Sequence, residues 1–596
     1  MDRNEFAVLN VLRHGQVAPQ RDIAAACGLS VGTVNRTCRT LAQKGLAAAV
    51  QSGGMTVTEE GLASLEPYRV ENAVIMAAGL SSRFAPISYE KPKGLLVVKG
   101  EVLIERQIRQ LHEAGITDIT VVVGYKKEHF FYLEDKFGVK IVVNAEYASR
   151  NNNSSLMVVR RSLGSTYICS SDGYFSVNPF EPYVYRAYYA SVRVEGPTDE
   201  WCIKPGRGGR IESVAVGGAD AQIMLGQVYF DRAFSKRFVE ILEAEYNRPE
   251  TEGKLWEAIY VDHIKELDMY VRPYPEGVIH EFDSLDELRE FDPYFLRNVD
   301  SDIFTNIASV LGCDLDSVHD VYPLKQGLTN LSCHFAVGDE EYVYRHPGAG
   351  TEHLVNRAAE MAAQSVGHDL GLDDTFIYED PAVGWKISRF IPDVRTLDPS
   401  DPAQIRQAMD MVRTLHESGA SVERSFDFFD ESCRYLDLIG ELKGEVEIPG
   451  FADMAAKIAR LKAFASQDGA ETCLSHNDFF ELNLLLDRQG KMYLIDWEYA
   501  GMSDYASDFG TFTVCCRLDR SQAEEALGFY LGHLPTESER KHCFAYVALA
   551  GWCWYVWSLF KEAQGGHVGE WPYVYYRYVV EYLDLVLGWY EGGLSD

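Results

Sequence analysis

The stretch "CLSHNDFFELNLLLDRQGKMYLIDWEYAG", residues 473–501, decides how the C-terminal half of the chain is interpreted. Two apolar runs of strand length flank a polar loop that contains His476, Asp478 and Asn483, and Asp496 ends the second run. Carboxylate and amide oxygens are suitable ligands for Mg²⁺. The spacing therefore predicts a phosphoryl-transfer loop, in which Asp478 accepts or orients the proton of a substrate hydroxyl while Asn483 and Asp496 hold Mg²⁺.

The segments around this loop predict a small β-rich lobe followed by a larger helical lobe. "CHFAVGDEEYVYRHP" and "GWKISRFI" have strand composition, and long helical patterns follow. With H-N-D-x4-N and D-W-E in place of the H-R-D and D-F-G of protein kinases, the chain resembles the choline kinase and aminoglycoside phosphotransferase family over about residues 320–596. The resemblance implies an α+β bilobal kinase-like domain, set at residues 300–596, that uses ATP; the sequence has no Walker A string.

The resemblance also assigns nucleotide-binding residues in the small lobe. Arg345 in "EYVYRHPG" stands where protein kinases carry a strand lysine, and Glu360, in an apparent helix, is its expected ion-pair partner. An ordinary surface pair is the alternative for these two residues. The turn in "KQGLTNLSCHFAV" is expected to cover the phosphates.

The tryptophans in "AGWCWYVWSLFKE", residues 550–562, divide by helical geometry. Trp554 and Trp557 lie about 60° apart on one helix face, whereas Trp552 points away and is assigned to core packing. Choline kinases carry a W-x-x-W pair in a cage around choline, so the resemblance implies that Trp554 and Trp557 face that cation. Glu498 is expected to add charge to the cage, with a structural role as the alternative, and either Tyr573 or Tyr576 to close it.

A second pattern opens residues 70–295 with "NAVIMAAGLSSRFAPISYEKPKGLL". An apolar strand, Val74–Ala77, precedes a small-residue loop, a helix pattern and a further strand at Ile119–Val123, which predicts a doubly wound α/β domain. Small residues let backbone N–H groups approach a triphosphate, and a cation then holds its oxygens. The predicted nucleotide-binding residues are Ala78, Gly79, Leu80, Arg83 and Lys93, the last two also as catalytic cations.

The strings A-A-G-x-S-S-R-F and P-K-x-L-L resemble the nucleotidyltransferase family, and residues 72–290 resemble more closely its bacterial CTP:phosphocholine cytidylyltransferases. The resemblance implies a Rossmann-like domain, set at residues 70–295, that transfers CMP from CTP and releases pyrophosphate. It also implies that Mg²⁺ is held by Asp172, after an apolar strand, and by Glu281 and Asp283, on one side of an extended segment. A structural role in turns is the alternative for these carboxylates.

Two tryptophans of this domain, Trp201 in "DEWCIKP" and Trp256 in "GKLWEAIY", have two interpretations. Large aromatic side chains are most often core residues. Their positions also resemble the choline-facing aromatic residues of the cytidylyltransferases, whose ring faces attract a quaternary ammonium.

Residues 1–68 predict three helices, the third capped by Ser30, and a hairpin around Ser52-Gly53-Gly54. This order resembles the winged helix-turn-helix family. The resemblance implies that Thr33, Asn35, Arg36 and Arg39 face a major groove. A fold retained for packing or dimer contact is the alternative, and DNA binding stays open.

Composition limits the function further. The net charge of −33 excludes a general affinity for nucleic acid. Twelve cysteines without a C-x-x-C pair, and an N-terminus without an apolar signal core, favour the cytoplasm. Residues 543–560 carry no formal charge, but aromatic residues run through their middle, so a buried helix and no membrane contact are predicted. The oligomeric state stays open, a homo-oligomer included.

The two predicted sites share a chemical logic. A choline kinase makes phosphocholine, and a cytidylyltransferase converts it with CTP into CDP-choline, so the resemblances imply one chain that performs both steps. A kinase and nucleotidyltransferase for ethanolamine or a sugar is the first alternative. The second is a transcriptional regulator that senses choline or nucleotides, although the intact carboxylates of both predicted metal sites argue against it.

Overall fold

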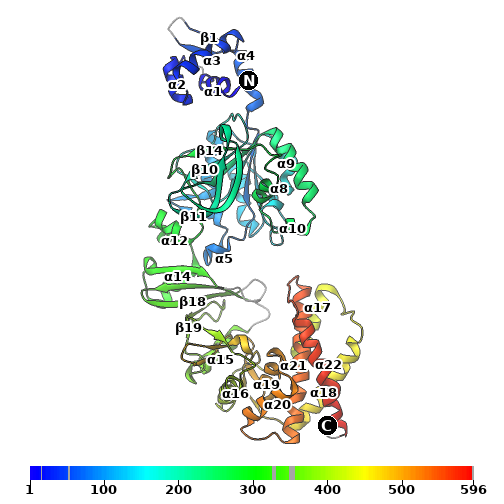
Figure 1. Ribbon diagram of the computed structural model, residues 1–596. Coiled ribbons are helices and arrows are strands. Elements are labelled where there is room, and N and C mark those ends of the chain that lie inside the picture. The colour runs from blue at the N-terminus through cyan, green and yellow to red at the C-terminus, as the bar shows by residue number, and fades with distance from the viewer. Residues whose placement is uncertain (15–16, 51–53, 325–329, 348–355, 593–596) are drawn as a thin grey trace. The chain divides into compact units, whose positions relative to one another are not determined.

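The chain divides between Pro323 and Leu324 into two units, Met1–Pro323 and Leu324–Asp596 (Figure 1). The computed structural model describes residues 1–14, 17–50, 54–324, 330–347 and 356–592. The domain limits set from the sequence, at residues 1–68, 70–295 and 300–596, stay predictions.

The first unit begins with a winged helix. Its elements are α1 (Arg3–Leu12), α2 (Gln20–Cys27), α3 (Val31–Gln43), β1 (Ala47–Ala49), β2 (Met55–Val57) and α4 (Glu59–Ala63). Ser30 caps α3 by accepting the Thr33 N–H, as predicted. β1 and β2 pair antiparallel, with Ala47 opposite Val57. The three helices and the two wing strands are therefore confirmed, while residues 52 and 53 of the predicted hairpin turn lie outside the described residues.

A mixed sheet forms the centre of the α/β part. Its strands lie in the order β12-β11-β13-β8-β3-β6-β7, and β10 and β14 join it beside β13. β3 runs parallel to both β6 and β8, and β7 runs parallel to β6. The strand bounds are β3 (Asn72–Ala77), β6 (Ile119–Val123), β7 (Lys140–Val143), β8 (Thr166–Ser170), β10 (Tyr188–Arg193), β11 (Pro197–Pro205), β12 (Ile211–Ala219), β13 (Gln222–Phe230) and β14 (Tyr270–Tyr274).

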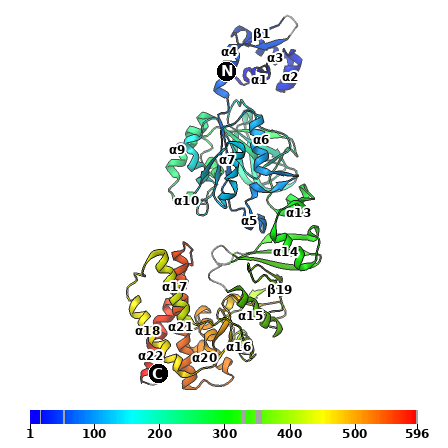
Figure 2. The ribbon, with the colours of Figure 1, turned by 180° about the vertical axis from the view of Figure 1, so that it is seen from behind.

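Helices cover both faces of this sheet because successive side chains of β3 point to opposite sides. Ile75 packs with α6 (Leu103–Glu113) and α7 (Tyr132–Phe137), which lie in front of the sheet in Figure 2. Val74 packs on the other face with α8 (Asn153–Val159), α9 (Arg232–Glu245) and α11 (Trp256–Asp262). The doubly wound α/β prediction is thus confirmed, and the carboxyl ends of β3 and β8 meet at one edge, where such sheets bind ligands.

Short elements complete the first unit. They are η1 (Glu66–Tyr68), η2 (Ser82–Phe84), α5 (Ile87–Glu90), η3 (Lys93–Leu95), β4 (Val97–Val98), β5 (Glu101–Val102), η4 (Lys127–Phe130), η5 (Arg160–Ser162), β9 (Tyr174–Phe175), η6 (Arg207–Gly209), α10 (Pro249–Glu252), β15 (Ile279–His280), α12 (Leu285–Phe291), α13 (Phe295–Asn298), α14 (Asp302–Leu311), η7 (Leu315–Ser317) and β16 (Val318–Pro323).

The second unit has the predicted order of a β-rich lobe and a helical lobe. In the small lobe, β17, β18, β20 and β19 lie side by side in that order, each antiparallel to the next, and α15 accompanies them. Their bounds are β17 (Asn330–Val337), β18 (Glu340–Pro347), α15 (Arg357–Asp369), β19 (Phe376–Glu379) and β20 (Lys386–Arg389).

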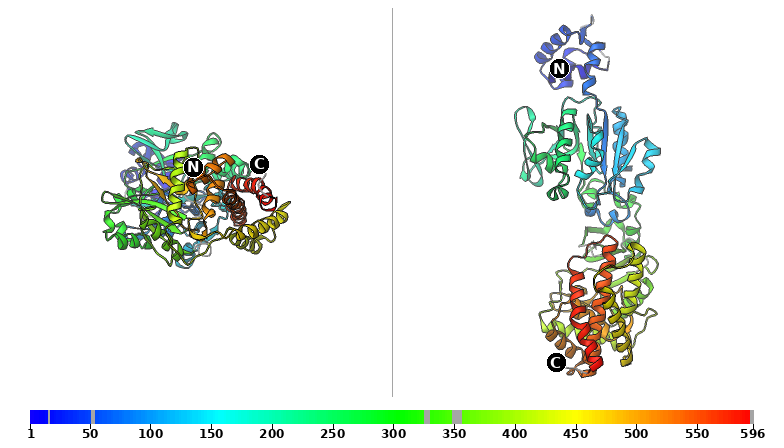
Figure 3. Two further views of the ribbon diagram at one scale, coloured as in Figure 1. Left: turned by 90° about the horizontal axis from the view of Figure 1, so that it is seen from below. Right: turned by 90° about the vertical axis from the view of Figure 1, so that its right-hand side faces the viewer.

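The large lobe is built around one hydrophobic core that most of its helices share. Its elements are β21 (Arg395–Thr396), α16 (Pro402–His416), α17 (Phe428–Lys443), α18 (Phe451–Ala465), η8 (Ser466–Asp468), β22 (Thr472–Ser475), η9 (Glu481–Asn483), β23 (Leu484–Leu486), β24 (Met492–Leu494), β25 (Gly501–Asp504), α19 (Ala506–Cys515), α20 (Arg520–Leu531), α21 (Glu537–Ala563) and α22 (Trp571–Gly592). The last two helices lie side by side (Figure 3).

By length and composition α21 qualifies as a membrane span, but 94% of its most apolar window is buried inside the unit. A core helix has this property, so the burial agrees with the helix predicted for residues 543–560.

Candidate active sites

The predicted phosphoryl-transfer loop runs between β22 and β23. Asn483 Nδ2 donates to Oδ2 of Asp478 at 2.9 Å and to its backbone carbonyl at 2.8 Å. Behind the loop, the buried Asp508 accepts the backbone N–H groups of His476 at 2.9 Å and of Asn477 at 2.5 Å. Burial, and then the charge of Asp496, raise the pKa of Asp478 to about 8. The loop thus holds a half-buried carboxyl group with a raised affinity for a proton.

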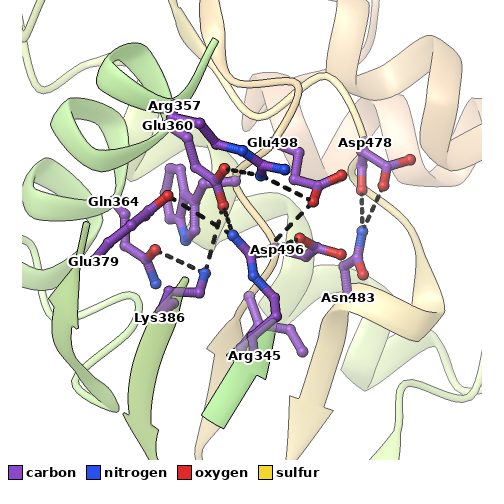
Figure 4. Close-up of polar contacts among 12 residues, drawn as sticks. Arg345, Arg357, Glu360, Gln364, Glu379, Lys386, Asp478, Asn483, Asp496 and Glu498 are labelled. Carbon is purple, nitrogen blue, oxygen red and sulfur yellow. Dashed lines mark hydrogen bonds and ion pairs between the residues drawn. The ribbon is translucent and has the colours of Figure 1, made fainter. Parts of the chain in front are cut away.

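Arg345 of β18 connects this loop region with α15 (Figure 4). Its Nη1 donates to Oδ1 of Asp496 at 2.8 Å, and its Nη2 donates to Glu360. Burial alone would raise the pKa of Glu360, but the charges of Arg345, Lys386 and Arg357 together outweigh it and lower that pKa to about 2. The structure therefore places Arg345 beside Glu360 in the interior, and the pair is not a surface contact.

Glu498, predicted to add charge to the choline cage, lies in the ion network around Arg345. Its Oε1 is 3.6 Å from Arg345 Nη1 and 3.5 Å from Arg357 Nη1. Carboxylate oxygens of Glu360, Asp496 and Glu498 all lie within 4.8 Å of one another. Such a group of hard oxygen donors fits a divalent cation.

Trp554 and Trp557 come together as the helical geometry predicted. Their ring centroids are 6.1 Å apart at 85°, and Trp554 stands at 90° to Tyr499 with a centroid distance of 5.3 Å. Trp554 Nε1 donates to Thr511 Oγ1 at 3.3 Å. Trp552 packs instead against Phe451, with centroids 4.8 Å apart, which agrees with its assignment to the core.

Neither of the two tyrosines proposed to close the cage is placed against Trp554. Tyr573 is 65% exposed, and Tyr576 packs against Tyr555 at 5.7 Å. Tyr499 takes this place because it follows the D-W-E string, one residue after Glu498. The sequence did not single out Tyr499, and only its position directly after Glu498 could have indicated it.

In the first unit, the loop after β3 meets the predicted metal carboxylates. Ala78 is buried and Gly79 and Leu80 are exposed. Arg83 Nη1 lies 2.8 Å from Oδ1 of Asp283. Lys93 Nζ lies 2.6 Å from Oδ2 of Asp172 and donates to the carbonyl of Phe282. Each predicted phosphate-binding cation is therefore paired with a predicted metal ligand.

The carboxylates of this site have opposite pKa shifts. Burial would raise the pKa of Asp172, but the charge of Lys93 and the hydrogen bonds from Lys93 and Ser170 together outweigh it and lower that pKa. Burial, followed by repulsion from Asp172, raises the pKa of Glu281 to about 8. Glu281 is exposed and Asp172 is half-buried, and two carboxyl groups that repel each other at an accessible site fit a divalent cation, which would neutralise both.

The two tryptophans of the first unit lie in different surroundings. Trp201 of β11 is partly buried against the sheet core. Trp256 is 1% exposed, stacked on Tyr189 at 6.0 Å with its edge contacts to Phe230 and Phe238. Other side chains therefore cover Trp256, as expected for a core residue. Its ring fills the space between the sheet and α9.

Glu257, which the sequence did not single out, lies directly after Trp256. Its side chain accepts hydrogen bonds from Tyr189 Oη at 3.4 Å and from Asn152 Nδ2 at 3.2 Å. Burial raises the pKa of Glu257 to about 7. Only its position beside a predicted ligand-facing tryptophan gave an indication of it.

Two further predictions concern the turn expected to cover the phosphates and the exposed face of α3. Residues 325–329, in the turn expected to cover the phosphates, lie outside the described residues. In α3, Arg36 and Arg39 are exposed, while Thr33 is partly buried and Asn35 donates to Gln20 Oε1 at 2.9 Å. Two basic side chains of the predicted groove-facing set are therefore accessible.

Three family models match the chain. The MobA-like NTP transferase domain covers residues 73–172, the phosphotransferase enzyme family residues 320–542, and the winged helix-turn-helix DNA-binding family residues 1–47.

Two cytidylyltransferases each match about a third of the chain. The choline-phosphate cytidylyltransferase of Streptococcus pneumoniae is 37% identical over 199 residues, which are 33% of this chain and 87% of the relative. The 2-aminoethylphosphonate cytidylyltransferase of Lancefieldella rimae is 38% identical over 204 residues, 34% of this chain and 83% of the relative.

Solved structures match the second unit as well. The choline kinase LicA of Streptococcus pneumoniae is similar with a TM-score of 0.42 and 24% identity, and the match covers 47% of this chain and 97% of the kinase. By these sequence matches the chain belongs to the MobA-like nucleotidyltransferase family that includes the choline-phosphate cytidylyltransferase of Streptococcus pneumoniae, and it joins that domain to a domain of the phosphotransferase enzyme family and an N-terminal winged helix.

Proposed function

We propose that this chain phosphorylates choline with ATP and then transfers CMP from CTP to the phosphocholine, releasing pyrophosphate, in the cytoplasm. The observation that carries the proposal is the presence of both sites in one chain. The Asp478–Asn483 contact belongs to one site and the Lys93–Asp172 pair to the other. The product of the first reaction is the substrate of the second.

In the phosphotransferase site, Asp478 would take the proton of the choline hydroxyl as the new O–P bond forms. Its raised pKa suits a proton acceptor, provided that the carboxyl is ionised when substrate binds. Asp496, with Asn483 and Glu498 beside it, would hold Mg²⁺, which neutralises charge on the ATP phosphates. Arg345 and Glu360 would orient the phosphates.

In the nucleotidyltransferase site, the loop Ala78–Leu80 would approach the triphosphate of CTP through its backbone N–H groups. Arg83 and Lys93 would hold the phosphate oxygens of the pyrophosphate leaving group, after release from Asp283 and Asp172. Asp172, Glu281 and Asp283 would hold Mg²⁺, which supplies charge neutralisation between the attacking phosphate and CTP.

The aromatic side chains around Trp554 indicate which chemical class of amine the kinase step would accept. Trp554, Trp557 and Tyr499 offer ring faces at steep angles, which favour a quaternary ammonium. The 38% identity to a 2-aminoethylphosphonate cytidylyltransferase supports a phosphonate as a second candidate acceptor of CMP. A phosphotransferase forms an O–P bond and not the C–P bond of a phosphonate, so its presence in the chain favours a phosphorylated amino alcohol.

The winged helix adds a separate proposal, DNA contact through α3, which the exposed Arg36 and Arg39 support.

The proposal is tested by incubating the purified chain with ATP, CTP and Mg²⁺ and with choline, ethanolamine or 2-aminoethylphosphonate at equal concentration. Phosphorus NMR should show phosphocholine and then CDP-choline with choline, and removal of Mg²⁺ by EDTA should stop both steps. Formation of neither product from choline would show that the proposal is wrong. Conversion of 2-aminoethylphosphonate alone would support the second candidate.

A further inference from the structure

Glu379, the last residue of β19, has an enclosed carboxylate beside the phosphotransferase site (Figure 4). The residue is 1% exposed, and among the described residues neither of its side-chain oxygens has a hydrogen-bond partner. Buried carboxyl groups are usually hydrogen-bonded, because burial removes the water that would solvate them. Glu379 therefore has unused acceptor capacity that needs an explanation.

The cations that face Glu379 are Lys386 and Arg345. Burial, followed by repulsion from the neighbouring Glu360, raises the pKa of Glu379 to about 8. Nη2 of Arg345 lies 3.8 Å from Oε1 of Glu379, too far for a hydrogen bond but close enough for an ion pair. The same nitrogen donates to Glu360, and Nη1 donates to Asp496. Nε of Arg345 is buried without a hydrogen-bond partner among the described residues. The guanidinium is thus shared among carboxylates and retains a donor that is not used.

In the proposed reaction, the guanidinium of Arg345 and Mg²⁺ compete for the carboxylate of Asp496. It is the main contact of Arg345 Nη1, and it is also the residue expected to hold Mg²⁺. A divalent cation at Asp496 and Glu498 would repel the guanidinium, since like charges this close interact strongly in a poorly solvated interior. The bond between Arg345 and Asp496 is therefore the contact that metal binding weakens first.

We propose that Glu379 is a positioning residue that receives the guanidinium of Arg345 when a divalent metal takes Asp496. The shift is short, because Nη2 already faces Glu379. Glu360 stays in place meanwhile, since Arg357 Nη1 lies 3.0 Å and Lys386 Nζ lies 3.6 Å from it. Lys386 is itself held by Gln364 Oε1 at 2.9 Å. Arg345 then keeps a fixed orientation toward the nucleotide without competing with the metal.

The inference rests on the proposed binding of ATP and metal by this unit, and it is tested by binding rather than by turnover. All chains in this test are full-length and carry Asp172→Asn. This change disables metal-dependent nucleotide binding at the nucleotidyltransferase site. Calorimetry measures the Kd of the non-hydrolysable ATP analogue AMPPNP, with Mg²⁺ and with EDTA. Glu379→Gln should weaken binding with Mg²⁺ about tenfold and leave binding in EDTA unchanged, and its Tm in EDTA should not fall.

Glu341→Gln is the matched control, because Glu341 is a carboxylate of β18, in the same sheet as Glu379, and is 47% exposed. It should bind like the parent chain under both conditions. Equal Kd values with Mg²⁺ for Glu379→Gln and its parent would overturn the inference, as would a lower Tm in EDTA with unchanged binding, which indicates a merely structural role. A parent that fails to bind AMPPNP with Mg²⁺ would instead overturn the proposed function on which the inference rests.

Discussion

In the proposed kinase step, Trp554 is the side chain that we expect to favour a cationic substrate. Its ring stands at steep angles to Tyr499 and Trp557, so the three rings form a corner. A desolvated ammonium gains about 2 kcal/mol from such faces. We expect Trp554→Leu to raise the KM for choline at least about tenfold, since 1.4 kcal/mol corresponds to tenfold. The KM for ATP, measured in the same steady-state assay, should stay within about twofold.

Trp552→Leu is the control for this change, because Trp552 belongs to the same helix and is 1% exposed. Its Nε1 donates to Ser432 Oγ at 3.1 Å and its ring packs on Phe451, so its loss should lower Tm. The KM for choline should not change. An equal rise of that KM in both variants would show that the helix, and not a cage, is what Trp554 supports.

At the scale of elements, His416 connects three helices behind the phosphoryl-transfer loop. It ends α16, its Nε2 lies 2.9 Å from Asp508 Oδ2 of α19, and its Nδ1 lies 2.8 Å from Tyr530 Oη of α20. Burial alone would lower its pKa, but the hydrogen bond to Asp508, with a smaller contribution from Cys473, outweighs it and raises the pKa of His416 to about 9. The charged imidazole therefore stabilises the carboxylate that holds the loop.

The direction of the pH dependence follows from that shift. Because the folded-state pKa exceeds the ordinary value of 6.5, the stabilisation is fully present below pH 6.5 and is lost as pH rises through about 9. We expect the Tm of the second unit to fall between pH 7 and 9.5, by about 2–4 °C for each kcal/mol lost. Tryptophan fluorescence reports this unit, since seven of the nine tryptophans belong to it.

His416→Gln supplies the comparison, because glutamine keeps a hydrogen bond to Asp508 but does not titrate. The variant should begin at a lower Tm at pH 7 and lose less of it up to pH 9.5. Parallel curves for the two proteins would mean that a group other than His416 causes the fall.

The sequence predicted where strands form more completely than it predicted the contacts between distant elements. The strands at Val74–Ala77 and Ile119–Val123 are found as β3 and β6, because local apolar patterns determine where a strand forms. The contact between Asp478 and Asn483 also follows from short spacing along one loop. In contrast, the hydrogen bond between Arg345 and Asp496 joins residues 151 positions apart, and that between His416 and Asp508 joins residues 92 apart.

Long-range contacts of this kind depend on how elements pack, which spacing along the chain does not contain. Glu379 illustrates the limit, since nothing in its neighbouring letters distinguishes a buried carboxyl group at the end of a strand from an exposed one. The sequence predicted that Glu498 supplies negative charge, but it did not predict that Arg345 and Arg357 are its partners. Those contacts are evident only from the fold.

At the scale of the whole molecule, each proposed reaction is contained in one unit with its own core. The phosphotransferase residues pack around the core of Leu324–Asp596, and the nucleotidyltransferase residues around the sheet of the first unit. Domains with separate cores are expected to fold and act independently. Asp172→Asn should therefore lower CDP-choline formation at least about a hundredfold, as loss of a charge-stabilising group does. Its rate of choline phosphorylation should match that of the unmodified chain.

The reciprocal change completes this prediction. Asp478→Asn should lower choline phosphorylation by about 10²–10⁴-fold, the usual contribution of a proton acceptor, and leave conversion of added phosphocholine unaffected. Mixing the two variants with choline, ATP, CTP and Mg²⁺ should restore CDP-choline after a lag, because phosphocholine made by one chain reaches the other through solution. Chromatography of quenched samples follows both products. Failure of the mixture, with each variant retaining its own remaining activity, would show that the intermediate must pass within one chain and that the two units do not act independently.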